Sequence, residues 1–237
     1  MLLSGKPKFY GRRKGRTIRK AKSSLMEKFL PHIALREIGL NMFGTTVKEI
    51  HLEIGFGDGQ HLAGQAKNNP DIGFIGAEVF ENGVANLLSL ITGIKEGKNL
   101  PESFQLENQR VDNIRVFNND IRLLLSKIPD NFLTKIYVLF PDPWPKTRHK
   151  ERRIINQENL CEFARILKKG GILRIATDHK VYKGWALRQL AESSHFRWTA
   201  KTSDDWRKEP IDWVKTKYQE KALREGRKPI FLNFEKV

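Results

Sequence analysis

The sequence predicts an α/β fold in which a mostly parallel sheet carries helices on both faces. Short runs of β-branched and aromatic residues alternate with helix-like stretches from residue 47 onward, and this alternation favours a parallel sheet. A chain of 237 residues is long enough for such a sheet to bury its own core. Neither an internal repeat nor a change of composition interrupts the pattern after residue 25, so we expect one folded domain.

The expected strands are short apolar runs bounded by turn-forming residues, at 47–54, 73–79, 114–118, 135–140, 171–177, 196–201 and 230–234. The expected helices lie between them, at 59–68, 81–95, 120–127, 156–169, 180–193 and 214–226. The last two strands flank a longer connection, which is compatible with an antiparallel pair at the end of the sheet. Residues 25–40 form an apolar lead-in broken by Pro31. The polar, patternless residues 95–113 favour a surface insertion over a working loop.

The charge of the chain indicates a polyanionic partner. Lys and Arg number 43 against 27 Asp and Glu, which gives a net charge of +16 and favours nucleic acid as the partner. The single cysteine excludes a disulfide framework and a cysteine zinc site, and the six histidines show no metal-ligand spacing, so we expect no metal. No apolar run approaches the roughly 18 residues of a membrane span, and the amino-terminal residues lack a signal peptide's apolar stretch. We expect a cytoplasmic protein that does not enter the membrane.

The amino-terminal charge is concentrated in one segment. Residues 1–22 hold nine Lys and Arg residues, and no acidic residue precedes Glu27. Three glycines and a proline interrupt any helix there, so residues 1–24 are expected to form a basic flexible arm ahead of a domain at 25–237. Such an arm can follow phosphates, with an affinity that falls steeply as salt rises.

A glycine loop follows the first expected strand. Gly55, Gly57 and Gly59 let the backbone turn sharply and approach a ligand, and Glu53 enters the loop with a negative charge. Glu78, at the end of the next strand, is placed to accept both ribose hydroxyls of an adenosine. A carboxylate at the loop repels a pyrophosphate but suits a ligand with an amino group and no phosphate, such as S-adenosylmethionine.

Asp120 follows the third expected strand and has two open interpretations. It can meet the adenine amino group at the carboxyl end of the strand, or it can be the N-cap of the helix at 120–127. One residue can fill both roles.

The loop after the fourth expected strand carries the most unusual motif. Three prolines within residues 141–145 stiffen it and present Asp142 and Trp144 at the carboxyl end of a strand, where α/β sheets bind ligands. A basic cluster follows directly. A stacking aromatic beside Lys and Arg side chains is the combination that RNA recognition uses.

These residues carry a family resemblance. PDPWPKTRHKERR at 141–153 closely resembles the signature of the bacterial tRNA (guanine-N7-)-methyltransferases, the TrmB type. EIGFGDG at 53–59, GAEVFENG at 76–83, TDH at 177–179 and the segment at 216–234 fall in the family's order. The resemblance covers about residues 47–237. It implies a seven-stranded, Rossmann-like class I S-adenosylmethionine-dependent methyltransferase that acts on guanine 46 in the tRNA variable loop and yields S-adenosylhomocysteine.

The resemblance also implies roles for individual residues. Glu53, Glu78, Asp120 and Asp142 match the cofactor-site acids beside the glycines of the loop, and Asp142 also matches the catalytic residue. Positions that match substrate contacts are Lys146, Asp178, Thr216, Lys217, Tyr218 and Gln219. Positions that match or flank the RNA-contacting run are Trp144, Arg148, His149, Lys150, Arg152 and Arg153.

The chain departs from the family pattern in three places. Gln219 stands where the family has Glu, Thr147 and Glu151 replace basic residues, and residues 97–108 look like an insertion.

The chemistry needs few residues. Guanine N7 carries a lone pair and no proton, so its methylation requires no general base, and a fixed carboxylate, Asp142 or Asp178, can stabilise the charge that develops on the purine. The family implies action without an obligatory protein partner, as a monomer or homodimer. Two alternatives come from other classes: a nicotinamide-dependent oxidoreductase on a related fold, and a non-catalytic RNA-binding module. The loop spacing and net charge count against the first, and the full set of acids counts against the second.

Overall fold

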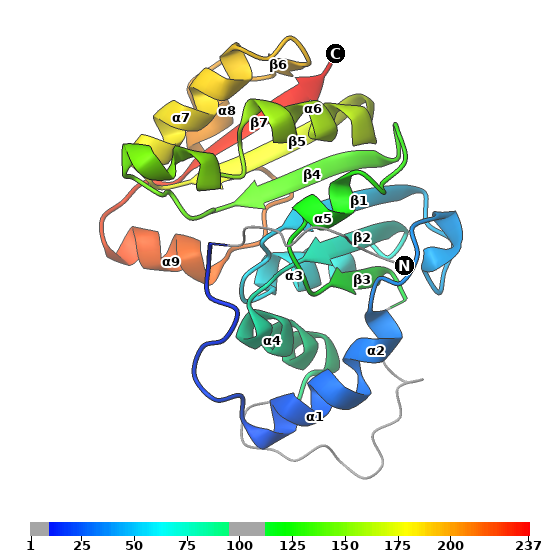
Figure 1. Cartoon of the computed structure of the whole chain (residues 1–237). Coiled ribbons are helices and arrows are strands. Elements are labelled where there is room, and N and C mark those ends of the chain that lie inside the picture. The colour runs from blue at the N-terminus through cyan, green and yellow to red at the C-terminus, as the bar shows by residue number, and fades with distance from the viewer. Residues whose placement is uncertain (1–9, 95–111) are drawn as a thin grey trace. The chain divides into compact units, whose positions relative to one another are not determined.

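The computed structural model describes residues 10–94 and 112–237 (Figure 1). It divides into a first unit, which extends to Leu123, and a second unit, Leu124–Val237. Most of the polar stretch at 95–113, which we interpret as an insertion, lies outside the described residues, as do the first nine residues of the expected arm.

The first unit contains three parallel strands, β1 (Glu49–Ile54), β2 (Ile72–Ala77) and β3 (Ile114–Phe117), with β2 in the middle. Ile54 lies opposite Ala77, and Ala77 lies opposite Phe117. The three strands therefore end at one level, and the loops that follow them share one edge of the sheet. This is the edge at which parallel α/β sheets bind ligands.

The described residues of this unit form the helices α1 (Lys20–Lys28), α2 (Leu30–Ile33), α3 (Gln60–Asn68) and α4 (Glu81–Thr92). A 3-10 turn, η1 (Leu40–Met42), follows α2, and α5 (Arg122–Leu125) follows β3. The apolar lead-in supplies α1 and α2, because Pro31 is tolerated in the first turn of a helix. Helix α4 ends at Gly93, a C-cap residue in the left-handed conformation with a φ of 68°, which glycine adopts readily.

Helix α1 begins inside the range expected for the flexible arm. Its Leu25 is fully buried and the following Phe29 is 1% exposed, and both pack in one apolar cluster with Leu87 and Leu88 of α4. Burial of each such side chain contributes about 1.5–3 kcal/mol, which is enough to hold the helix in place. The charge run at 12–22 therefore continues into a packed helix from Lys20 onward.

The second unit contains β4 (Leu133–Leu139), β5 (Leu167–Thr177), β6 (Phe196–Trp198) and β7 (Ile230–Lys236), in the order β4-β5-β7-β6. Strands β4 and β5 are parallel, and β7 runs antiparallel to both β5 and β6. The helices are α6 (Gln157–Ile166), α7 (Lys180–Ala191), α8 (Asp204–Arg207) and α9 (Lys217–Arg224), with a 3-10 segment, η3 (Thr147–Arg152).

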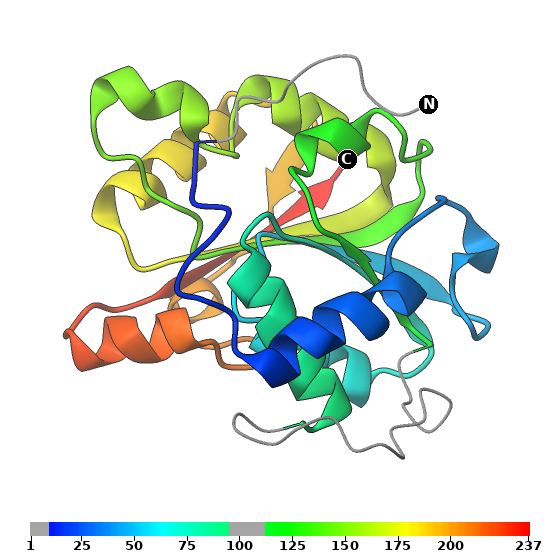
Figure 2. The same ribbon diagram turned by 60° about the horizontal axis from the view of Figure 1, so that its bottom comes forward.

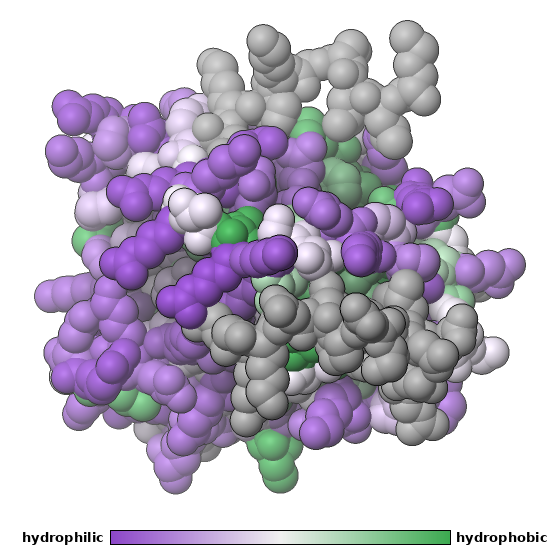
Figure 3. All heavy atoms as spheres, turned by 90° about the horizontal axis from the view of Figure 1, so that it is seen from below, coloured by the Kyte–Doolittle hydropathy of each residue, from purple (hydrophilic) through white to green (hydrophobic). Residues whose placement is uncertain are grey.

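The expected fold class is confirmed. All seven expected strands are present in the described residues, and the set is mixed but mostly parallel, as the longer connection before the last strand allows. Two differences stand out: β5 begins at Leu167, where a helix was expected through residue 169, and β6 has three residues where residues 196–201 were expected. The face seen in Figure 3 is predominantly hydrophilic, with apolar side chains in small separate patches.

An ion-pair network ties the connection before α9 to the strands of the second unit. Arg174 of β5 is buried and donates to Asp212 Oδ1 at 2.7 Å, and Lys135 of β4 reaches Asp212 Oδ2 at 3.1 Å. Arg174 Nε also donates to Asn233 of β7 at 2.8 Å. Partial burial alone would raise the pKa of Asp212, but its hydrogen bonds and opposite charges lower it to about 2.

We predict that Asp212→Asn lowers the free energy of unfolding at neutral pH by about 1–2 kcal/mol, because a buried guanidinium loses its counter-charge while solvent screens part of the loss. The pKa of Asp212 is depressed in the folded state, so its contribution is complete above about pH 4 and is lost as pH falls toward 2. Urea unfolding of both proteins between pH 3 and 7 measures the difference, which should shrink at the acidic end.

The matched control is Asp204→Asn, which removes an ion pair with Lys208 in which both side chains are mostly exposed. That change should alter stability by less than about 0.5 kcal/mol. Equal losses in the two variants, or a difference at Asp212 that does not vary with pH, would contradict the assignment.

Candidate active site

The glycine loop after β1 takes the shape that the sequence predicts. Gly55, Gly57 and Gly59 all have positive φ, at 69°, 55° and 78°. A Cβ on Gly59 would lie 2.7 Å from Cβ of Leu87, so this glycine is required for close packing on α4. A Cβ on Gly55 would meet no heavy atom within 4 Å. The loop is thus packed on one side and open at Gly55, where a ligand has room.

Glu78 lies where sequence reasoning places it, in the loop after β2. It is 8% exposed, and its Oε1 accepts the N–H groups of Val79 and Phe80 at 2.7 and 2.9 Å. Its Oε2 accepts the N–H of Gly57 at 2.7 Å. Charge-assisted bonds of this kind are about twice as strong as neutral ones, so the carboxylate direction is firmly set against the glycine loop.

Glu53, at the end of β1, is buried and has a partner that sequence reasoning missed. Its Oε2 lies 2.7 Å from Nδ1 of His61, which sits in the first turn of α3 and is 1% exposed. His61 was considered from the sequence only as a possible metal ligand, and the pattern did not indicate that it pairs with Glu53. The available signal was its position in the first turn of α3, directly after the glycine loop, on a helix that packs against β2.

Of the two interpretations of Asp120, the structure supports the helix cap. The side chain is 5% exposed, and its Oδ1 accepts the backbone N–H of Arg122 at 3.0 Å. The guanidinium of Arg122 also pairs with this carboxylate, and the N–H of Leu123 reaches the Asp120 carbonyl at 3.0 Å. The adenine contact stays a prediction.

In the second unit, the proline-rich loop that follows β4 is held by a buried arginine. Arg153 is 5% exposed, donates to the carbonyls of Pro143 and Trp144 at 3.1 and 2.8 Å, and stacks at 4.5 Å on the ring of Trp185. Phe140 and Trp144 take positive φ values of 49° and 40°, which side chains rarely adopt. Arg153 therefore shapes the loop, and its expected contact with RNA stays a prediction.

Asp142 stands on this loop between two prolines. The residue is exposed, but partial burial of its carboxyl raises its pKa above the ordinary value. Solvent contact keeps this effect moderate.

The other cations of the cluster lie on η3 or just before it. Lys146, Arg148 and Lys150 are exposed. Arg152 stacks on the Trp144 ring at 4.9 Å, and His149 meets the same ring edge-on at 5.8 Å. Partial desolvation and the neighbouring cations lower the pKa of His149. The predicted aromatic and its cations therefore do form one surface cluster.

Asp178 and the 216–219 segment occupy different surroundings in the same unit. Asp178, after β5, pairs with Arg227, a partner that the sequence pattern did not indicate. Thr216 precedes α9, and its Oγ1 accepts the N–H of Gln219 at 3.1 Å. Lys217 and Tyr218 are exposed.

The structure explains why glutamine occupies position 219. Gln219 is 1% exposed, accepts from Nε1 of Trp213 at 2.7 Å and donates from Nε2 to Glu209 at 2.6 Å. A carboxylate cannot donate, and a Glu here would place like charges together in a buried site. Gln219 and Thr216 therefore organise the start of α9, while their exposed neighbours face solvent.

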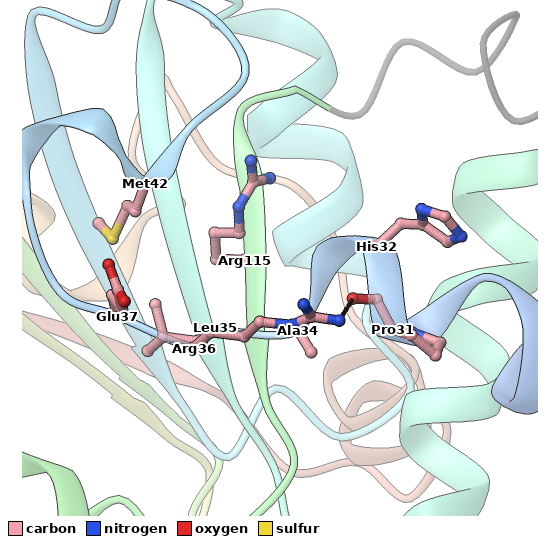
Figure 4. A pocket seen from close by; sticks show the side chains of 8 residues that line it. All are labelled: Pro31, His32, Ala34, Leu35, Arg36, Glu37, Met42 and Arg115. Carbon is pink, nitrogen blue, oxygen red and sulfur yellow. Dashed lines mark hydrogen bonds between the residues drawn. The ribbon is translucent and has the colours of Figure 1, made fainter.

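A separate surface pocket of about 430 Å³ lies beside β3. Figure 4 shows Arg36 donating to the Pro31 carbonyl while the guanidinium of Arg115 points away from it. None of its lining residues belongs to the predicted site. The pocket therefore lies apart from the acids that the sequence singled out.

Within residues 10–94 and 112–237, no group of three or more His, Cys, Asp or Glu residues could hold a metal ion. In the same ranges, no helix has the length and apolar character needed to cross a membrane.

We predict that Arg153→Met lowers the free energy of unfolding by about 1–3 kcal/mol, because the half-buried carbonyls of Pro143 and Trp144 lose their donors. Arg148→Met, five residues earlier and exposed, should stay within about 0.5 kcal/mol. Urea unfolding followed by tryptophan fluorescence separates the two. Similar small losses in both variants would mean that Arg153 does not hold the loop.

Comparisons with known proteins agree on the class. The family model described as "Putative methyltransferase" matches residues 47–232. The tRNA (guanine-N(7)-)-methyltransferase of Rhodospirillum rubrum is 43% identical, over 96% of this chain and 87% of its own length. The enzymes of the same name from Paramagnetospirillum magneticum and Bartonella henselae are 42% and 41% identical, over 95% of this chain and 91% and 94% of theirs.

Solved structures support the fold at much lower identity. An antibiotic-related methyltransferase superposes with a TM-score of 0.51 at 16% identity, over 94% of this chain and 97% of that one. The antibiotic-resistance methyltransferase Kmr gives a TM-score of 0.50 at 14% identity, over 94% and 98%. With the glycine loop, its acids and the proline-rich loop in the family's order, the chain belongs to the tRNA (guanine-N(7)-)-methyltransferase family.

Proposed function

We propose that this enzyme transfers a methyl group from S-adenosylmethionine to N7 of guanine 46 in the variable loop of tRNA, in the cytoplasm. The observation that carries the proposal is the proline-rich loop, which Arg153 locks in a strained shape beside a cluster of exposed cations. A rigid carboxylate next to a stacking aromatic and cations suits a purine in RNA.

The first unit fits the cofactor. Gly55 leaves open space at the loop, and Glu78 is directed by three backbone N–H groups, so a neutral, hydroxyl-rich ribose has both room and an acceptor. The residues of the first unit that hold the cofactor are Glu53, Gly55, Gly57, Gly59, Glu78 and Asp120. When bound, S-adenosylmethionine supplies a methyl group attached to a sulfonium.

The residues of the chain bind and orient, and they need not remove a proton. Guanine N7 presents a lone pair, so no side chain has to act as a base. Asp142 stabilises the positive charge that develops on the purine, which a fixed carboxylate does best in a water-poor site. The raised pKa of Asp142 means that this role is lost on the acidic side as its carboxylate is protonated.

The substrate contacts are exposed and half-buried side chains of the second unit, from the loop after β4, η3, the end of β5 and the start of α9. Trp144, Arg148, His149, Lys150 and Arg152 meet the RNA, with Lys146, Asp178, Lys217 and Tyr218 nearer the base. Thr216 and Gln219 position that last pair from the start of α9. We further propose that the enzyme needs no metal and no obligatory protein partner, and works as a monomer or homodimer.

The experiment that tests the function is transfer of labelled methyl from S-adenosylmethionine to an unmodified tRNA transcript, beside a transcript with adenine at position 46. Label in the guanine transcript alone is the expected result. Label in both would discard the position and keep the reaction. Label in neither, despite measurable cofactor binding, would overturn the proposed substrate.

We predict that Asp142→Asn lowers kcat at least 100-fold, because loss of one preorganised electrostatic partner typically costs this much. Binding of S-adenosylhomocysteine should stay within a few fold, as measured by calorimetry. Glu158→Gln, an exposed change in the first turn of α6, is the control and should turn over normally. Normal turnover by Asp142→Asn would remove the residue from the mechanism.

A further inference from the structure

The basic segment ahead of α1 is docked by its backbone onto the start of α4. The Arg13 carbonyl accepts the N–H of Glu81 at 2.9 Å. Asn82 makes two bonds to the segment: its Oδ1 accepts the N–H of Gly15 at 2.8 Å, and its Nδ2 donates to the Arg16 carbonyl at 2.7 Å. Figures 1 and 2 both show the dark-blue segment running beside the first turn of α4.

The docking satisfies groups that the helix leaves open. The first N–H groups of a helix have no partner within it, and Phe80, which precedes α4, provides no side-chain cap. The Arg13 carbonyl supplies that cap to Glu81 from outside the helix. Gly15 allows the close approach, because a Cβ there would lie 2.8 Å from Cζ of Phe80. The segment is therefore fitted to α4 and is more than a solvated charge run.

The docked segment joins the loops that carry two of the candidate cofactor acids. Phe80 lies in the same loop as Glu78, after β2, and Asn82 lies in the first turn of α4. In the loop after β3, Asn119 precedes Asp120 and accepts a hydrogen bond from Arg13 Nη2 at 2.8 Å. Residues 13–16 thus connect the carboxyl ends of β2 and β3, the edge at which the cofactor is proposed to bind.

A second contact links the same region to the glycine loop. Asn86, one turn after Asn82 on α4, accepts from Lys22 Nζ at 3.0 Å and donates from Nδ2 to the Asp58 carbonyl at 3.0 Å. Helix α4 therefore contacts the arm and the glycine loop through neighbouring asparagines. Asn82 therefore holds Gly15 and Arg16 to the first turn of α4, while Asn86 bridges Lys22 and the glycine loop.

We propose that residues 13–16 form a strap and that Asn82 is its positioning residue, so that cofactor affinity depends on the docked arm. The inference rests on the proposed function. The side chains of Arg12, Lys14 and Arg16 are exposed while the backbone is held, so RNA phosphates can bind them without undocking the strap. Binding of tRNA and of cofactor is then coupled, and the coupling is reciprocal.

Two variants undock the strap by independent means. Asn82→Ala removes both of its bonds to the arm, and Gly15→Ala forces a methyl group against Phe80 while the Asn82 side chain stays intact. Gly39→Ala is the matched control in the same unit, because its Cβ would meet nothing within 4 Å and its backbone is extended. None of the three positions belongs to the proposed cofactor or RNA contacts.

The measurement is calorimetric binding of S-adenosylhomocysteine to the full chain, with and without unmodified tRNA, together with thermal unfolding. We expect Asn82→Ala and Gly15→Ala to raise the Kd about 5- to 20-fold, a coupling of ordinary size. Gly39→Ala should match the wild type. In the wild type, tRNA should tighten S-adenosylhomocysteine binding about fivefold, and this gain should disappear in both strap variants.

Wild-type affinity in both strap variants would overturn the proposal, and so would an equal weakening in Gly39→Ala. A tRNA effect that survives in weakened strap variants would overturn the coupling. Failure of the proposed function has a different signature, because the wild type itself would then bind no S-adenosylhomocysteine or transfer no methyl group.

Steady-state kinetics provide a second readout. The strap variants should raise the KM for S-adenosylmethionine and leave kcat within about twofold of the wild type.

Discussion

The candidate site of the first unit depends on the hydrogen bonds that backbone N–H groups donate to the carboxylate of Glu78. It is buried and accepts N–H groups from Val79, Phe80 and Gly57. A buried charge is tolerated only when hydrogen bonds satisfy it. Because one donor belongs to the glycine loop and two belong to the acid's own loop, the loop shape and the carboxylate direction are set together. Any ligand therefore meets a site whose acceptor is already oriented.

In the second unit, a buried positive charge fixes a loop as the buried carboxylate of Glu78 does in the first. The buried guanidinium of Arg153 donates to two carbonyls of the proline-rich loop and stacks on Trp185. Prolines cannot donate, so such a loop has carbonyls in excess and needs donors from elsewhere. Arg153 supplies them and holds Trp144 in its left-handed conformation. Rigidity around Asp142 thus depends on a residue eleven positions away in the sequence.

The Lys and Arg residues behind the net charge of +16 fall into two groups, one buried and one exposed, with different roles. Arg153 and Arg174 are buried, and each is satisfied by carbonyls or carboxylates of its own unit. Lys146, Arg148 and Lys150 are exposed and available to phosphates. Buried charges hold loops and connections in place, whereas exposed ones set the electrostatic attraction to RNA.

The sequence alone determined the fold class, the order of strands along the chain, the glycine loop, the position of Glu78 and the family, because period-two and helical patterns and loop motifs are local. Tertiary structure decided what each polar residue contacts. His61 beneath Glu53, Arg153 behind the proline-rich loop and Glu209 beside Gln219 are partners from other segments. The arm likewise looked like a flexible charge run, because its capping of α4 uses backbone groups that carry no sequence signature. Spacing along a chain does not reveal such contacts, since burial and pairing arise only when distant segments pack together.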